Sequence, residues 1–247
     1  MREILILAEL EGGMLHSSAG ELLAAGRKLG DEMGADVSAA VLGESTDDAA
    51  REAIILGADH VYTASHPILT EGLADGQIAA LEQICAETSP LAILTAKTPL
   101  GRSVGPRLAY RLDSGVAQDC MDVTGDNTTG RITVTRPVYG GNAMAKFTFA
   151  DNNPQVVVLR VKAFEPLDPN PERSGDVKSI EVTIDDSQIK AKLVETVKEE
   201  SEGVKLEDAG VIIGGGRGLG GPEPFEQLEE LAKLFNGAVG ASRAVCD

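Results

Sequence analysis

The residues best suited to chemistry in this sequence lie near its carboxyl end, in a glycine-rich turn. Gly216, Gly218 and Gly221 follow the spacing G-x-G-x-x-G, after an apolar run and before an amphipathic one, as a dinucleotide-binding turn requires. Glycines let the backbone approach a phosphate closely, and free N–H groups at the start of the next helix favour an anion. The turn therefore predicts a nucleotide-binding βαβ unit.

A serine and an arginine follow the second strand expected in this unit. In an NAD-binding fold that strand ends in Asp or Glu, which holds the ribose hydroxyls, whereas here the run AVGA is followed by Ser242 and Arg243. An arginine at this place suits the 2′-phosphate of NADP. It could equally put a cation and a hydroxyl group beside a flavin ring, so the residues alone leave both cofactors open.

The remaining reactive side chains form no second constellation in the sequence. His16, His60 and His66 are widely separated, and we interpret them as surface or capping residues because no triad or metal spacing involves them. The three cysteines lack a C-x-x-C pair and are expected to be reduced, mostly buried thiols. Cys246 has no nearby base and is interpreted as a packing residue. We expect no catalytic residue and no metal site.

The composition is that of an acidic globular protein. The 247 residues carry a net charge of −17, and aromatic residues make up only 3 % with no Trp. This charge would repel a phosphate backbone, and few side chains could stack on bases, so nucleic acid is excluded as a partner. The amino-terminal residues MREILILAELEGG do not resemble a targeting peptide, and no apolar run approaches the ~20 residues of a membrane span. A cytoplasmic location is expected.

The first hundred residues alternate between apolar runs and amphipathic segments. This βαβαβαβ order predicts a parallel sheet with helices on both faces. Strands are expected at 4–8, 37–42, 59–63 and 91–96, and helices at 18–33, 45–56 and 75–88. A further helix is expected within 98–112, where Pro106 should either delay the regular helix until about Ser103 or kink it.

Beyond residue 115 the pattern changes to strands separated by turn clusters. The turns suggest hairpins, so we expect the parallel sheet to end in an antiparallel extension. A segment rich in proline and polar residues then suggests a domain boundary. Strands are expected at 116–123, 132–139, 143–149, 155–161 and 179–184, whereas 190–200 fits either a helix or an edge strand.

Several segments together resemble the electron transfer flavoprotein alpha subunits. GGRGL and VGASRA, joined by the helix FEQLEELAKLFNGA, look like the start of the FAD domain of that family. The upstream segments ILAELEGG, ELLAAGRKL, LGRSVGPRLAYRL and RPVYGGNAMA are similar to the family too, in the family's order. The resemblance spans nearly the whole chain.

The resemblance implies an α/β fold in two parts. Residues 1–165 would form a Rossmann-like domain, 166–178 a linker, and 179–247 the first part of a second α/β domain that binds FAD. The expected FAD contacts are Gly216, Arg217, Gly218, Ser242 and Arg243. Arg243 would lie near the flavin ring, where a permanently charged guanidinium favours negative charge on the ring.

One departure from the family concerns the carboxyl end. The family continues past GASR with segments that supply further flavin contacts, whereas this sequence stops at Asp247. The chain is therefore expected to be C-terminally truncated relative to the family. Its FAD site would be incomplete, with an exposed sheet edge.

By resemblance the chain would pair with a beta subunit and act as an electron carrier, with no bond-making of its own. FAD would carry electrons from acyl-CoA dehydrogenases of fatty acid β-oxidation, or related flavoproteins, to a quinone reductase or another acceptor. AMP or a second FAD would belong to the beta subunit, and bifurcation of electrons stays open. Arg102, Arg107 and Arg111 share one helical face, which either meets a partner or is solvated. The alternatives are an NADP-dependent oxidoreductase and a non-catalytic Rossmann-like scaffold.

Overall fold

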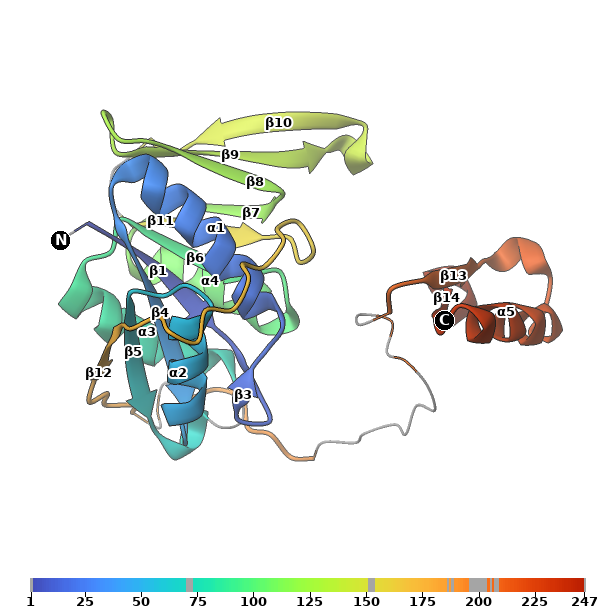
Figure 1. Cartoon of the computed structure of the whole chain (residues 1–247), viewed down its shortest axis with the longest axis horizontal. Helices are drawn as coiled ribbons and strands as arrows, with labels where there is room; N and C mark the ends of the chain where they lie inside the picture. Colours follow the sequence, from blue (N-terminus) through green and yellow to red (C-terminus); the bar gives the residue numbers. More distant parts are fainter. Residues whose placement is uncertain are drawn as a thin grey trace. The chain divides into compact units, whose positions relative to one another are not determined.

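The chain folds into two compact units, Met1–Leu193 and Val194–Asp247. The computed structural model in Figure 1 describes residues 2–69, 73–150, 154–185, 187, 189–195, 204, 206 and 209–246. The division falls later than the predicted linker at 166–178. The reason is that residues 176–179, at the end of that linker, pair with the large sheet of the first unit.

A parallel sheet of seven strands forms the centre of the first unit, in the order β12-β5-β4-β1-β6-β11-β7. The six neighbouring pairs are all parallel. The strands are β1 Glu3–Ala8, β4 Asp36–Gly43, β5 His60–Ser65, β6 Ala92–Ala96, β7 Val116–Cys120, β11 Gln155–Leu159 and β12 Asp176–Ser179. The predicted α/β fold class is confirmed.

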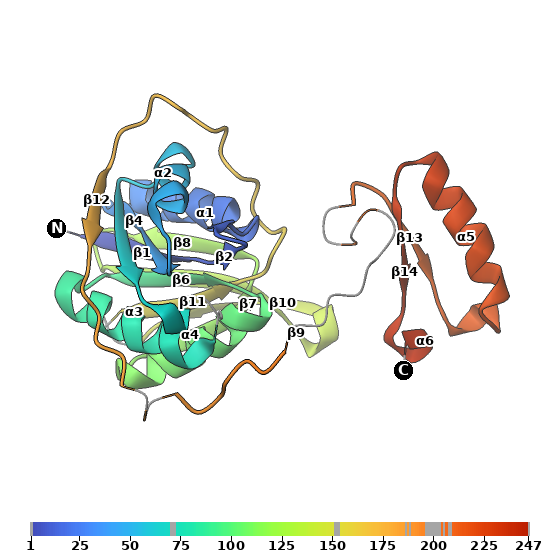
Figure 2. The same ribbon diagram turned by 90° about the horizontal axis from the view of Figure 1, so that it is seen from below.

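Helices cover both faces of this sheet (Figure 2). One face holds α1 Ser18–Met33 and α2 Asp47–Ile55, and the other holds α3 Ala74–Thr88 and α4 Pro99–Arg111. The fully buried strand β1 divides its side chains between the two cores. Ile4 and Ile6 pack on the side of α1, whereas Leu5 and Leu7 pack on the side of α3 and α4. A strand buried on both faces reads as an unbroken apolar run, which is why the sequence revealed it.

A separate antiparallel sheet of three strands packs against α1. It consists of β8 Asp122–Asp126, β9 Arg131–Val138 and β10 Ala143–Thr148 in the order β10-β9-β8. The predicted strand at 116–123 is thus two strands, and β7 and β11 belong to the parallel sheet instead of the antiparallel extension. Short elements complete the unit: β2 Leu10–Glu11, β3 Met14–Leu15, η1 Pro67–Leu69 and η2 Tyr139–Gly141.

Helix α4 begins earlier than the sequence suggested. Pro99 occupies its first turn, where a missing N–H group costs nothing, and Thr98 caps it by accepting a hydrogen bond from the Gly101 amide at 2.9 Å. Pro106 lies inside the helix, between the buried side chains of Val104 and Leu108. The expected start near Ser103 is therefore wrong, because packing on the sheet offsets the backbone donor lost at Pro106.

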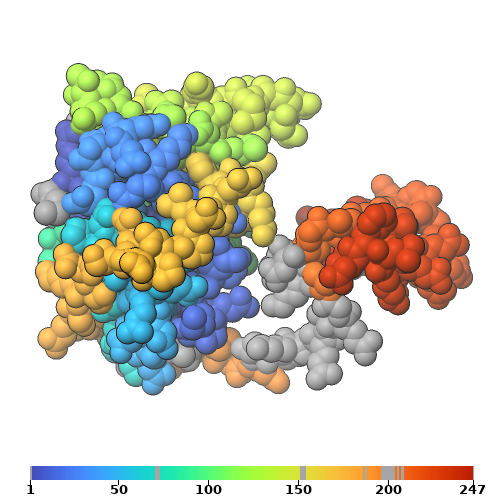
Figure 3. Space-filling view, viewed as in Figure 1, coloured from blue at the N-terminus to red at the C-terminus, as the bar shows by residue number. Residues whose placement is uncertain are grey.

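Residues 160–185, which follow β11, form a long strap that lies against the outside of the first unit. In Figure 3 its first part is the gold band lying across the blue helices. Arg173 Nη2 reaches Asp59 Oδ1 at 2.6 Å, and the side chain of Gln83 exchanges two hydrogen bonds with the backbone of Thr183. The strand expected at 179–184 is wrong: the strand here is β12 at Asp176–Ser179, and residues 180–184 form neither helix nor strand. Of the undecided segment 190–200, residues 190–195 form neither helix nor strand, and 196–200 lie outside the described residues.

The second unit is a single βαβ arrangement with a short helix at its end. Strands β13 Ile212–Gly215 and β14 Ala238–Ala241 pair in parallel, joined by η4 Arg217–Leu219 and α5 Glu223–Leu234 and followed by α6 Arg243–Cys246. In the part of the chain that the structure describes, no helix has both the length and the apolar character needed to cross a membrane.

Candidate functional site

The glycine-rich turn and the Ser-Arg pair meet at the carboxyl ends of β13 and β14. The Ser242 amide donates to the Gly215 carbonyl at 3.0 Å, and a Cβ atom added to Gly216 would lie 3.6 Å from Ser242 Oγ. Parallel strands present their carboxyl ends at one edge of the sheet, which is where such folds bind ligands. Two motifs separated in the sequence are thus brought together, as the sequence predicted.

The turn itself is a tight 3₁₀ structure. The Leu219 amide donates to the Gly216 carbonyl at 3.0 Å, and the Gly220 amide to the Arg217 carbonyl at 3.2 Å. Gly220 has a φ of +80°, a left-handed conformation that favours glycine. At Gly218, by contrast, nothing lies within 4 Å of an added Cβ atom. The glycine that the turn geometry requires is therefore Gly220, which the fingerprint spacing did not single out.

A hollow of ≈ 690 Å³ opens between the turn, the start of α5 and the start of α6. Two of the predicted residues, Gly216 and Arg217, line it directly. Gly218, Ser242 and Arg243 adjoin lining residues in the sequence and are exposed. The lining consists of Gly216, Arg217, Gly220, Gly221, Pro222, Phe225, Ala241, Ala244 and Val245.

Close packing of α5 on β13 gives the hollow an apolar wall. A Cβ atom added to Gly215 would lie only 2.6 Å from Phe225 Cε1, so a glycine at this position lets the ring lie against the strand. Phe225, Ala244 and Val245 line the hollow but were not singled out from the sequence. The signal that could have found them is that each begins the helix that follows a strand end, the region where ligands of α/β folds bind.

The positive charge at this site comes from arginines more than from the helix start. The α5 amino terminus holds Pro222 and Pro224, which lack N–H groups, and Glu223 and Glu226 lie in its first turn. These acids already complement the helix dipole. A phosphate bound here would therefore depend on Arg217, which lines the hollow, in contrast to the helix amides expected from the sequence.

The edge of the first unit carries a charged cluster of a different kind. Asp119 accepts hydrogen bonds from Arg160 Nε and Nη2, both at 2.8 Å, and lies 2.7 Å from Lys97 Nζ. The Arg160 guanidinium, with Lys97, holds the pKa of Asp119 well below its usual range. Asp119 has a backbone φ of +62°, a left-handed conformation that aspartate tolerates. The cluster ties together the ends of β6, β7 and β11, and we interpret it as structural.

Two of the histidines act as local caps, in agreement with the sequence. His16 Nδ1 lies 3.2 Å from the Ser18 amide, and His66 Nδ1 lies 3.2 Å from the Ile68 amide. His60 instead lies between two carboxylates of neighbouring strands. None of these arrangements resembles a catalytic triad.

The cysteines are free thiols. Burial raises the pKa of both Cys85 and Cys120 to about 12, so these two are inert packing residues. Cys246 is exposed, and the expectation that it packs is wrong. Among the described residues, no group of three or more His, Cys, Asp or Glu side chains is placed to hold a metal ion.

Comparison with known families matches both units. Residues 4–185 match the family described as the electron transfer flavoprotein domain, and residues 205–247 match the electron transfer flavoprotein FAD-binding domain. The second match covers the glycine-rich turn, the hollow and the Ser-Arg pair. The match to the first family extends over most of the chain.

Relatives of similar sequence are named for electron transfer. Electron transfer flavoprotein subunit alpha of Thermoanaerobacterium thermosaccharolyticum is 36% identical over 246 residues, which cover 100% of this chain and 74% of the relative. The subunit alpha of Megasphaera elsdenii is 37% identical over 246 residues, covering 99% and 73%. The acryloyl-CoA reductase electron transfer subunit beta of Anaerotignum propionicum is 31% identical over 276 residues, covering 100% and 74%.

Proposed function

The chain belongs to the family of electron transfer flavoprotein alpha subunits, and we propose that it binds FAD in the hollow at the carboxyl ends of β13 and β14. The observation that carries this proposal is the ≈ 690 Å³ hollow formed by the FAD-domain residues themselves. The glycine turn leaves the backbone open to a phosphate, and the apolar wall suits a flat ring. FAD, when bound, supplies the reversible uptake of electrons.

Each of the proposed contact residues has a separate task. Arg217 would neutralise phosphate charge at the turn, with Gly216 and Gly218 allowing close approach of the backbone. Ser242 would hydrogen-bond the flavin, and Arg243 would keep a fixed positive charge near its ring. Because that charge favours the reduced, anionic ring, Arg243 would raise the tendency of the site to accept electrons.

The proposed assembly is a heterodimer with a beta subunit that completes the flavin site. The names of the relatives, "subunit alpha" and "electron transfer subunit beta", support a system of paired subunits. Donors of the acyl-CoA dehydrogenase type are proposed, with a quinone reductase or another acceptor; the acryloyl-CoA reductase name of one relative supports electron exchange with an enzyme that acts on acyl-CoA, without giving its direction here. AMP or a second FAD would stay on the beta subunit.

We propose that the chain is an electron carrier and not an enzyme in its own right. The compartment proposed is the cytoplasm, in which the free thiols of this chain would stay reduced. The NADP-dependent enzyme and the scaffold considered from the sequence gain no support from the relatives' names, which refer to electron transfer.

The test is to co-express the chain with its beta subunit and measure bound flavin by absorbance. We expect flavin in the wild-type complex, a strong loss in Arg243→Ala, and partial retention in Arg243→Lys. Lys233→Ala is the matched control, because Lys233 is a cation in the last turn of α5, at the other end of the helix from the hollow. Equal flavin content in Arg243→Ala and wild type would contradict the proposed site. NADPH binding without flavin would favour the oxidoreductase.

A further inference from the structure

The first unit contains a second place where a nucleotide would be expected to bind. Its strand order places β4 on one side of β1 and β6 on the other, so the chain reverses direction across the sheet between β1 and β6. In open α/β sheets, ligands bind at this switch point, outside the carboxyl ends of the two strands. The residues that follow β1 and β6 therefore decide whether the first unit accepts a ligand there.

In this chain the switch point is bridged by a carboxylate. Glu9 comes directly after β1, and Thr98 precedes α4. Thr98 Oγ1 lies 2.6 and 2.8 Å from the two carboxylate oxygens of Glu9, although the residues are 89 positions apart. Glu9 is 7% exposed and Thr98 is 8% exposed. Thr98 Oγ1 also accepts from the Gly101 amide, so its hydroxyl proton is available to donate to Glu9.

The first turn of α4 offers both the space and the positive charge that this carboxylate needs. A Cβ atom at Gly101 would lie 3.0 Å from Glu9 Oε1 and 2.0 Å from the Ala96 carbonyl oxygen, so a glycine here lets the carboxylate come close to the turn. Helix α4 has no acidic residue in its own first turn. Glu9 thus supplies the negative charge that a helix amino terminus favours. A bound phosphate would need the same hydroxyl and the same positive end of the helix.

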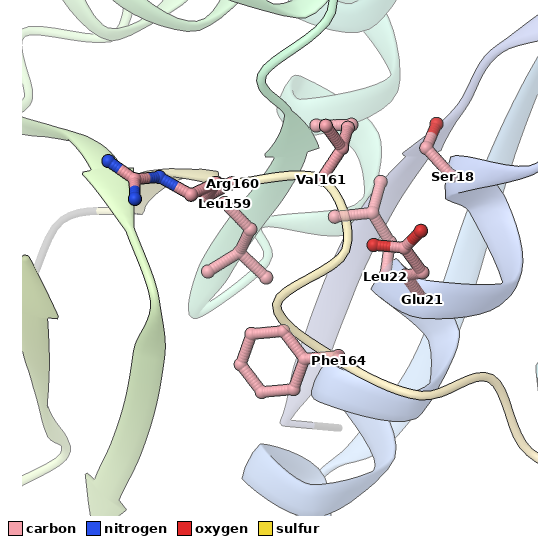
Figure 4. A pocket seen from close by; sticks show the side chains of 8 residues that line it. Ser18, Glu21, Leu22, Leu159, Arg160, Val161 and Phe164 are labelled. Carbon is pink, nitrogen blue, oxygen red and sulfur yellow. The ribbon is translucent and has the colours of Figure 1, made fainter. Parts of the chain in front are cut away.

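The amino terminus of α1, which lies near the same edge, is also occupied by a carboxylate of the chain itself. Glu21 lies in the first turn of α1, and its Oε2 accepts the Lys162 amide at 2.5 Å. Figure 4 shows the Glu21 carboxylate facing the chain that leaves β11. The pocket around it leaves ≈ 0 Å³ for a water-sized molecule. An anion therefore finds no space at the start of α1 either.

We propose that Glu9 is an internal anion that occupies the phosphate position of the first unit and so excludes nucleotides from its switch point. The first unit keeps the nucleotide-binding arrangement of strands and helices, while its own side chain fills the place that a ligand phosphate would take. The inference does not depend on the proposed flavin site, which lies in the second unit.

The test is a titration of the full chain with AMP and with inorganic pyrophosphate, followed at the Gly101 amide by NMR of glycine-labelled protein. This amide reports on the switch point alone, so binding elsewhere in the chain does not confuse the result. We expect no shift in wild type or in Glu9→Gln, whose amide still fills the position. In Glu9→Ala we expect a saturable shift, because the Thr98 hydroxyl, to which the Gly101 amide donates, becomes free for a phosphate oxygen beside that amide. Glu44→Ala is the matched control, because it removes an exposed acid that follows β4 at the same edge.

Two results would overturn the inference. One is a Glu9→Ala variant that keeps the native circular dichroism spectrum and shows no shift at Gly101 beyond that of Glu44→Ala. The other is a saturable shift at Gly101 in the wild-type chain, which would mean that Glu9 does not exclude the anion. If Glu9→Ala does not fold, Glu9→Ser takes its place in the titration, because its shorter side chain also leaves the phosphate position open, and the same two results decide.

Discussion

The two units of this chain place opposite residues at equivalent positions of the same motif. In each unit a strand ends and a parallel strand lies beside it, but β1 is followed by Glu9, whereas β13 is followed by Gly216. The carboxylate of Glu9 is buried against the start of α4. Gly216 instead lines an open hollow together with Arg217. The proposed difference in phosphate binding therefore lies in the residue after the strand, more than in the strand and helix pattern.

The two crevices also differ in how tightly they are packed. A Cβ atom at Gly101 would meet the Ala96 carbonyl oxygen at 2.0 Å, whereas a Cβ atom at Gly218 would meet nothing within 4 Å. The burial of the strands follows the same trend. All six residues of β1 are buried, whereas none of the four residues of β13 is. The place at Glu9 is filled by buried side chains, whereas the place at Gly216 is an open hollow.

The largest predicted effect is on the free energy of unfolding when one methyl group is added, either at Gly101 in the first unit or at Gly218 in the second. Gly101→Ala should lower the free energy of unfolding of the first unit by about 3 kcal/mol or more, because backbone atoms must move to admit the Cβ atom. Gly218→Ala should change stability by no more than ~0.5 kcal/mol. Chemical denaturation monitored by circular dichroism measures both. Similar losses in the two variants would show that the crevices do not differ in packing.

The next largest effect is on the affinity for FAD when one arginine is removed, either Arg217 in the second unit or Arg160 at the edge of the first unit. Arg217→Ala should weaken FAD binding by the alpha–beta complex about tenfold to a hundredfold, because a hydrogen bond to a charged group contributes about 1.5–3 kcal/mol. Arg160→Ala, at the edge of the first unit, should leave the affinity unchanged. Fluorescence titration of the flavin-stripped complex gives both dissociation constants. A loss of affinity in Arg160→Ala that equals the loss in Arg217→Ala would remove the distinction between the crevices.

The smallest effect is a pH dependence of the closed crevice. Burial raises the pKa of Glu9 above its usual value, opposed by the Thr98 hydroxyl, by charge on His16 and by the Gly101 amide. The folded state therefore holds this proton more tightly than the unfolded state, and stability from Glu9 is lost as pH rises through its folded pKa. Wild type should gain melting temperature relative to Glu9→Gln as the pH falls from neutral toward 4.5. A constant difference across this range would contradict the burial of the carboxylate.

Local pattern predicted much of this fold. The helical spacing of apolar residues at 18–33 matches α1 Ser18–Met33, and the unbroken apolar run of β1 matches a strand buried on both faces. The glycine spacing and the Ser-Arg pair likewise indicated the carboxyl ends of β13 and β14, where residues line or adjoin the hollow. These features depend on neighbours in the sequence, which is why the sequence alone revealed them.

Long-range pairing could not be predicted in the same way. The strands β7 and β11 were assigned to hairpins because turns flank them, yet they join the parallel sheet through partners distant in the sequence. Pro106 suggested a late helix start, because local propensity does not include packing on the sheet. The pairing of Glu9 with Thr98 across 89 positions was likewise invisible, although an acid directly after a strand end and a Thr-Pro pair after another were signals that could have indicated it.

The most direct test of the account is photolabelling of the alpha–beta complex with 8-azido-FAD, followed by mapping of the labelled peptides. The central claim is that the second unit holds the flavin and that Glu9 closes the first. The account predicts label within residues 215–246 of this chain and none within 9–20 or 96–106. Label in either of the latter two segments, or a labelled complex without label in 215–246, would contradict it.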